Sequence, residues 1–303
     1  MNSFQGVFVA TITPKRDGGP HIDIGAALEV VDFLCSKGVK GLALLGSTGE
    51  FVHFDMEERL RLHALAIKRS RVPVLVNISH SSLDGAVHLA REAAGAGASG
   101  LLLMPPSFFR YGQAEILEYY RQVAGEIGSA TPLLLYNIPF FTNELAIESA
   151  EQLLGEGVAA GIKDSSGRWE YFERLKALRD RRPFTLFIGN DVIFTRGRSA
   201  GAHGVVSGVA CAAPELMVAL DAAIVSGAGD KVAKLEHRLQ EFIAWLDRFP
   251  APMGVREAIA ARGLKTGPLA VPLGPEKQRE LAEFREWFGG WLKEVLGETA
   301  QPR

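Results

Sequence analysis

The sequence contains little cysteine and no apolar run long enough to cross a membrane. Only Cys35 and Cys211 occur among its 303 residues, and both lie in apolar segments. Because there is no C-x-x-C pair or closely spaced His/Cys set, we expect no structural zinc and predict two buried, reduced thiols. No segment approaches the ~18 uninterrupted apolar residues of a transmembrane helix, so no membrane association is expected.

Neither sign of charge dominates the chain. Lysine and arginine number 33, aspartate and glutamate 35, and the formal net charge is −2. Proteins that bind nucleic acid or anionic membranes usually carry a basic surface, so neither partner is expected. The segment Met1–Pro14 lacks the basic and apolar regions of a signal peptide. The sequence therefore predicts a soluble, cytoplasmic protein.

Short apolar segments alternate with amphipathic segments through the first two thirds of the chain. The predicted strands are Gly6–Thr13, Gly41–Gly46, Pro73–Ile78, Gly100–Met104, Pro132–Ile138, Val158–Lys163, Pro183–Ile188 and His203–Ser207. The predicted helices between them are Asp23–Lys37, Asp55–Ser70, Ser82–Ala96, Gln113–Ile127, Asn143–Leu154, Trp169–Leu178 and Val192–Ser199. Strands that are apolar throughout are typical of a parallel sheet covered on both faces. Eight such units predict an α/β fold, a TIM (β/α)8 barrel, with a doubly wound open sheet as the alternative.

Beyond residue 210 the pattern predicts helices alone. They are Pro214–Val225, Asp230–Phe249, Met253–Ala261 and Pro275–Leu296. We therefore predict a catalytic barrel domain over residues 1–210 and a C-terminal helical extension over residues 211–303 that packs on it. No G-x-G-x-x-G motif follows the first strand, which disfavours a dinucleotide site.

One lysine ends an apolar strand. Lys163 stands in the run VAAGIKDSSG, and reactive groups of such barrels lie at the carboxyl ends of the strands. Burial disfavours the ammonium and favours a neutral amine that can attack a carbonyl carbon. The alternative is a structural lysine that pairs with Asp164 or a neighbouring loop.

Hydroxyl groups end two other predicted strands. In GSTGE, Gly46–Glu50, the glycines allow successive N–H groups to surround an anion, and Ser47 and Thr48 add donors. The alternative is an ordinary glycine-rich turn. Tyr136, in YNIP, is either a general acid/base or a core tyrosine with a satisfied hydroxyl. Because the strand ends meet at one mouth, the set predicts an amine nucleophile with a proton relay and an anion cradle.

With GND after the seventh strand and GVVSG at the eighth, these motifs resemble the dihydrodipicolinate synthase / N-acetylneuraminate lyase family of class I aldolases. The resemblance extends roughly from Phe4 to Leu296 and includes RGLKTGP at Arg262–Pro268. It implies that Lys163 forms a Schiff base with the keto carbon of a small 2-keto acid and that Tyr136 moves protons. It also implies that no metal or organic cofactor is needed, and that the chain forms a homo-oligomer, a dimer of dimers.

The resemblance assigns further residues to the substrate. Ser47 and Thr48 would hold its carboxylate and couple to Tyr136. Gly189 and Val206 would line its pyruvyl end through backbone groups. The candidates for contacts with the remainder of the substrate are Asp191, Ser207, Asn190 and His80.

Two positions differ from the synthases of this family. In YNIPFFTN, Phe141 stands where synthases carry an arginine for the carboxylate of the aldehyde. In PPSFFRY, Phe108 stands where they carry a tyrosine that reaches across a subunit interface. Val192 follows Asp191 where sialic acid lyases carry an acidic residue. With Phe140, these phenylalanines predict an apolar distal half of the site; interface or core packing is the alternative.

The leading hypothesis is a Schiff-base lyase of pyruvate or a pyruvate-derived 2-keto acid, distinct from the lysine-pathway synthase. A dehydratase of a 2-keto-3-deoxy sugar acid would use the same lysine. A barrel that binds 2-keto acids without turnover is the alternative from another class. A metal-dependent barrel enzyme is disfavoured because no pair of His, Asp or Glu ligands stands at strand ends.

Overall fold

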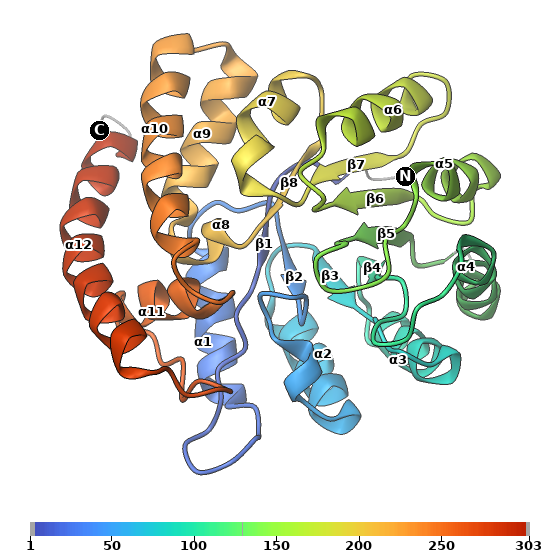
Figure 1. Cartoon of the computed structure of the whole chain (residues 1–303), viewed down its shortest axis with the longest axis horizontal. Coiled ribbons are helices and arrows are strands. Elements are labelled where there is room, and N and C mark those ends of the chain that lie inside the picture. The colour runs from blue at the N-terminus through green and yellow to red at the C-terminus, as the bar shows by residue number, and fades with distance from the viewer. Residues whose placement is uncertain (1–3, 129, 301–303) are drawn as a thin grey trace.

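The eight strands form one closed parallel barrel (Figure 1). The computed structural model describes residues 4–128 and 130–300. The strands are β1 (Gly6–Ala10), β2 (Gly41–Leu44), β3 (Val74–Asn77), β4 (Gly100–Leu103), β5 (Leu133–Asn137), β6 (Gly161–Asp164), β7 (Thr185–Ile188) and β8 (Gly204–Ser207). β8 pairs with β1, with Val205 opposite Val7. This pairing confirms the TIM barrel, and the open sheet is wrong because it would leave β1 and β8 as edges.

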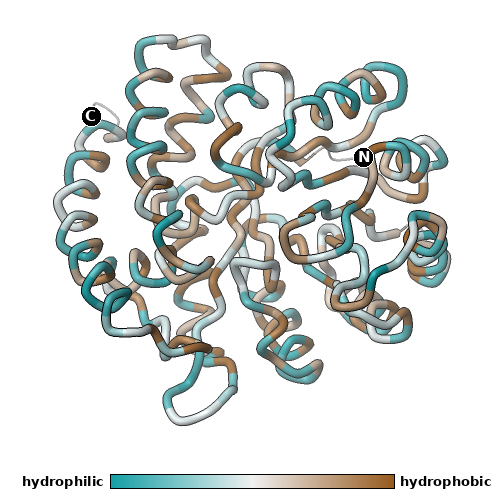
Figure 2. Tube along the Cα trace, in the orientation of Figure 1, coloured by the Kyte–Doolittle hydropathy of each residue, from teal (hydrophilic) through white to brown (hydrophobic). Residues whose placement is uncertain are grey.

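Helices surround the barrel between successive strands. They are α1 (Ile24–Cys35), α2 (Met56–Arg69), α3 (Leu83–Gly95), α4 (Gln113–Ile127), α5 (Ile147–Glu156), α6 (Trp169–Arg179) and α7 (Phe194–Ser199). Short helical turns occur at η1 (Phe51–His53), η2 (Asp191–Ile193) and α8 (Val209–Ala212). Figure 2 shows the hydrophobic segments gathered towards the strands and the hydrophilic ones on the outer turns of the helices.

Side chains alternate between the barrel interior and the layer under the helices. In β5, Leu134 and Tyr136 belong to the interior cluster, whereas Leu133 and Leu135 pack in the outer core with the helices. The same period of two governs every strand. It decides which residues at the strand ends can reach the mouth of the barrel.

Side chains cap the starts of α1, α2 and α3. The Asp55 carboxylate accepts the Glu58 N–H at 2.8 Å and begins α2, while the Glu58 carboxylate accepts the Ile22 N–H at 2.6 Å. The prediction that a helix begins at Asn143 is wrong, because α5 begins at Ile147. The Asn143 amide instead donates to two carbonyls of the loop after β4.

In the described part of the chain, the barrel is followed by the helices α9 (Pro214–Ser226), α10 (Gly229–Leu246), α11 (Met253–Ala261) and α12 (Pro275–Thr299). Aromatic side chains join α10 to α12, with the rings of Phe242 and Trp291 5.0 Å apart. The division into two domains at residue 210 stays a prediction. Over residues 4–128 and 130–300, none of the helices combines the length and apolarity that a membrane crossing requires.

Candidate active site

Lys163 projects into the barrel interior. Its neighbours in the two adjoining strands, Tyr136 and Phe187, belong to the interior cluster. The side chain is 3% exposed, and its Nζ lies 3.8 Å from the centroid of the Tyr136 ring. Asp164 follows on the opposite face, where its carboxylate accepts the Asn137 amide at 2.8 Å. The alternative in which Lys163 pairs with Asp164 is therefore wrong.

The Tyr136 phenol links the lysine to the turn after β2. Its hydroxyl is fully buried and shares a 3.0 Å hydrogen bond with the Ser47 hydroxyl. Among the described residues, Thr48 makes no such bond, although it lies close to Gly208. Lys163 thus contacts the Tyr136 ring, and the Tyr136 hydroxyl contacts Ser47. A proton can pass between a substrate bound at the lysine and this pair of hydroxyls.

Gly189 packs directly against the lysine. A Cβ at this position would lie 2.1 Å from the Ser165 Oγ and 3.0 Å from the Lys163 Cε, so no side chain fits. The Ser165 Oγ is itself buried without a hydrogen-bond partner. Our sequence reasoning missed Ser165, yet its position two residues after Lys163 placed it on the same face of the strand.

The β7 and β8 ends bring a carboxyl group to the same region. Burial raises the pKa of the Asp191 carboxyl, and hydrogen bonds from Ser207 and the Val209 N–H, with the Lys163 charge, oppose that rise. One carboxyl oxygen of Asp191 is buried without a partner. Val206 belongs to the barrel interior. Asn190 instead accepts the Val192 N–H at 3.1 Å and caps the following turn.

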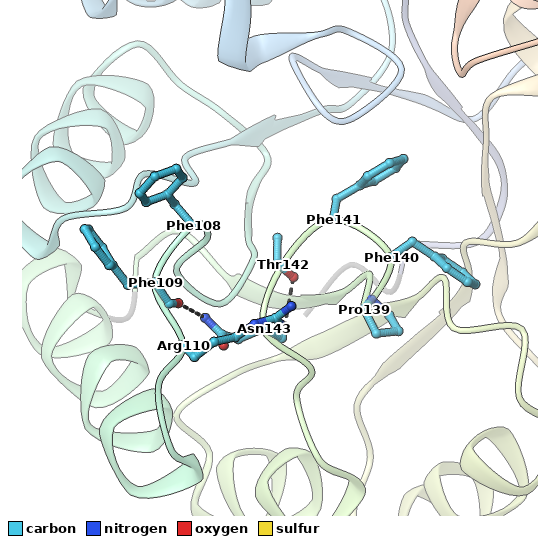
Figure 3. A pocket seen from close by; sticks show the side chains of 8 residues that line it. All are labelled: Phe108, Phe109, Arg110, Pro139, Phe140, Phe141, Thr142 and Asn143. Carbon is cyan, nitrogen blue, oxygen red and sulfur yellow. Dashed lines mark hydrogen bonds between the residues drawn. The ribbon is translucent and has the colours of Figure 1, made fainter.

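The phenylalanines after β4 and β5 surround a cavity of about 210 Å³ (Figure 3). Phe108, Phe140 and Phe141 are 90%, 70% and 60% exposed, so the alternative of core packing is wrong. Asn143 joins the two loops by donating to the Phe109 carbonyl at 2.7 Å. Lys163 does not line this cavity; the aromatic surface therefore lies outside the barrel interior.

His80 lies in a different place from the other specificity candidates. It lines a second cavity of about 240 Å³ with Phe51 and the Arg59 guanidinium. Its Nδ1 accepts the Ser82 N–H at 3.1 Å at the start of α3. The structure thus separates His80 from the cavity that Phe108 and Phe141 line. Within the described residues, no three His, Cys, Asp or Glu side chains gather as a metal site.

The chain is similar to known proteins over nearly its whole length. The sequence model of the Dihydrodipicolinate synthetase family matches residues 3–288. The 4-hydroxy-tetrahydrodipicolinate synthase of Methanothrix thermoacetophila is 31% identical over 93% of this chain and 95% of its own. An uncharacterized DapA-like lyase of Halobacterium salinarum is 31% identical over 88% of this chain and 87% of its own.

A solved structure has the same architecture. The 4-hydroxy-tetrahydrodipicolinate synthase of Methylacidiphilum fumariolicum SolV superposes with a TM-score of 0.87 at 27% identity. The superposition covers 97% of this chain and 98% of the other.

Proposed function

The chain belongs to the dihydrodipicolinate synthetase family of lyases, and from this premise we propose that it binds pyruvate or a pyruvate-derived 2-keto acid as an imine of Lys163. The observation that supports this most is the state of the lysine: a buried amine, without an ion pair in the described part of the chain, against the Tyr136 ring. A buried unpaired amine is costly for folding, which favours a chemical over a structural reason for it.

The proposed reaction begins when the Lys163 amine attacks the keto carbon. The carbinolamine that forms loses its hydroxyl as water and leaves a protonated imine. This cation accepts the electron pair of a C3–H bond, whose proton passes to the Tyr136 oxygen that was deprotonated in the preceding step, and an enamine results. The enamine C3 then attacks an aldehyde carbon, or the reverse cleavage releases one. Water finally hydrolyses the imine and restores the amine.

The neighbouring hydroxyls would serve this sequence. Tyr136 would protonate the departing carbinolamine hydroxyl and exchange the proton with Ser47, whose hydroxyl lies 3.0 Å away. The N–H groups and hydroxyls of Ser47 and Thr48 would bind the substrate carboxylate. Gly189 would leave room for the lysine to swing towards the keto carbon. The carboxyl of Asp191 would face the developing cation.

A direct experiment tests this function. The protein is incubated with pyruvate and sodium borohydride, and its intact mass and peptide masses are then measured. We expect the mass of one reduced pyruvyl group on the peptide that contains Lys163, because borohydride reduces an imine to a stable secondary amine. Wild-type protein that gains no adduct would contradict the proposal.

The loops that carry Phe108 and Phe141 follow β4 and β5 at the carboxyl ends of the strands, and we propose that they select an apolar or short aldehyde. Phe141 replaces the arginine that synthases of this family carry, and Phe108 replaces their tyrosine. Both side chains line the aromatic cavity. We therefore propose that condensation of pyruvate with aspartate semialdehyde is not the main reaction, although relatives carry the synthase name.

Phe141→Arg is expected to improve use of aspartate semialdehyde. A guanidinium can bind the aldehyde's carboxylate through two hydrogen bonds, so kcat/KM should rise about tenfold from a slow wild-type rate. The measurement is coupled turnover with pyruvate and aspartate semialdehyde. Phe140→Arg is the matched control, because it adds the same charge one residue away. A fast wild-type reaction, or an equal gain in the control, would overturn this assignment.

The aromatic surface also supports the proposed homo-oligomer. Phe108 is 90% exposed and has a φ of +76°, which is unfavourable for a residue with a side chain. A large apolar side chain held at the surface in this conformation fits a contact with a second copy. The dimer-of-dimers assembly and the cytoplasmic location stay predictions.

A further inference from the structure

Arg256 is the largest fully buried side chain among the described residues, at 1% exposure. It belongs to α11, in the helices that follow the barrel. Its Nη1 donates to the Glu50 carboxylate at 2.8 Å and to the Thr13 carbonyl at 3.0 Å. Its Nη2 donates to the Thr266 carbonyl at 2.5 Å. One guanidinium thus joins three segments that lie far apart in the sequence.

Stability alone is a weak reason for this arrangement. Removing two charges from water costs about as much as their attraction returns, and apolar side chains of similar volume often stabilise a core as well. The guanidinium is planar and rigid, so it fixes the positions of several hydrogen-bond acceptors relative to one another. One of these acceptors is the Glu50 carboxylate.

Glu50 ends the GSTGE turn in a strained conformation. Its φ is +52°, in the left-handed region that is unfavourable for glutamate. Its N–H donates to the Ser47 carbonyl at 3.0 Å and closes the turn. Gly49 passes so close to Leu45 that a Cβ would lie 2.8 Å from the Leu45 Cα. Strain of this kind persists only where surrounding contacts hold it.

Contacts at both ends hold the turn. The Ser47 hydroxyl meets Tyr136 inside the barrel. The Glu50 carboxylate meets the buried Arg256 guanidinium at 2.8 Å and the half-exposed His53 ring at 3.5 Å. If Arg256 released Glu50, the strained backbone could relax. The Ser47 and Thr48 groups would then move away from the substrate carboxylate.

We propose that Arg256 is a positioning residue for 2-keto acid binding. The Thr13 and Thr266 carbonyls fix its guanidinium, which through Glu50 holds the GSTGE turn in the geometry that receives the substrate carboxylate, without touching the substrate. The helices after the barrel thereby complete the active site from outside. This inference rests on the proposed imine chemistry at Lys163.

The test measures how the rate of reductive labelling by pyruvate depends on pyruvate concentration. In Arg256→Met, the half-saturating concentration should rise at least about tenfold, because a small displacement of binding groups is costly. The rate at saturating pyruvate should fall by a smaller factor than the half-saturating concentration rises, since Lys163 and Tyr136 remain in place. Arg256→Lys keeps the positive charge but lacks the planar guanidinium. It should raise the half-saturating pyruvate concentration to a value between those of wild type and Arg256→Met.

Arg262→Met is the matched control. Arg262 directly follows α11, and its side chain is 7% exposed; its guanidinium pairs with Glu215 at 2.7 Å and donates to the Ala212 carbonyl at 3.0 Å. It does not contact the GSTGE turn. We expect a loss of stability without a change in half-saturation. The proposal is overturned if folded Arg256→Met binds pyruvate like wild type, or if Arg262→Met weakens binding equally.

Two further readouts keep the outcomes separate. If Arg256→Met does not fold by circular dichroism, unchanged half-saturation in Arg256→Lys overturns the proposal. If wild type forms no adduct, the proposed function fails, and amide hydrogen exchange still tests the positioning. Exchange at Gly46–Glu50 should be faster in Arg256→Met, or in Arg256→Lys, than in Arg262→Met; equal exchange would contradict the role of Arg256.

Discussion

Replacing Lys163 with methionine is expected to abolish the borohydride-dependent adduct and to reduce turnover by at least about 10³-fold. No other group described near Tyr136 offers an amine to the keto carbon. Methionine has a similar length and no charge, so it should occupy the barrel interior without unfolding the protein. The midpoint of urea unfolding should stay close to that of wild type, because methionine fills the same volume.

Lys15→Met provides the matched control. Lys15 is also a buried lysine, at 8% exposure, but it lies beyond the end of β1. Its variant should form the adduct on Lys163 as wild type does. An adduct that persists in Lys163→Met, or that disappears in Lys15→Met, would show that Lys163 is not the nucleophile.

Tyr136→Phe is expected to slow turnover by about 10²-fold or more, the usual contribution of a positioned acid or base. The ring remains to pack against Lys163, so the loss isolates the hydroxyl and its 3.0 Å bond to Ser47. The measurement is the steady-state rate with the best aldehyde from a substrate panel. The rate of imine formation at saturating pyruvate should fall as well, because the carbinolamine hydroxyl loses its proton donor.

Tyr171→Phe is the control for this variant. The Tyr171 hydroxyl is also buried and donates to the Leu145 carbonyl at 3.0 Å, in α6 outside the barrel interior. Its loss should cost stability and leave turnover unchanged. Full turnover in Tyr136→Phe would show that the Tyr136 hydroxyl does not take part in the proton relay.

The order and kind of the elements could be predicted because each strand is an apolar run and each helix has an amphipathic period. The predicted bounds of α4 and α11 agree with the structure. Predicted strands were too long, as with Gly6–Thr13 against β1 at Gly6–Ala10. Apolar residues continue past the last ladder bond, so composition does not mark the end of a strand. Asn143 was misplaced because its amide serves a neighbouring loop.

The sequence by itself determined which residue types end the strands, and therefore the family resemblance and the candidates Lys163, Tyr136 and Ser47. Only the tertiary structure decided which of them meet. It paired Ser47 rather than Thr48 with Tyr136, and it exposed Phe108. It also brought Arg256 to Glu50, 206 positions away. Periodicity reports local geometry, whereas a hydrogen bond between distant segments depends on how the closed barrel and its outer helices pack.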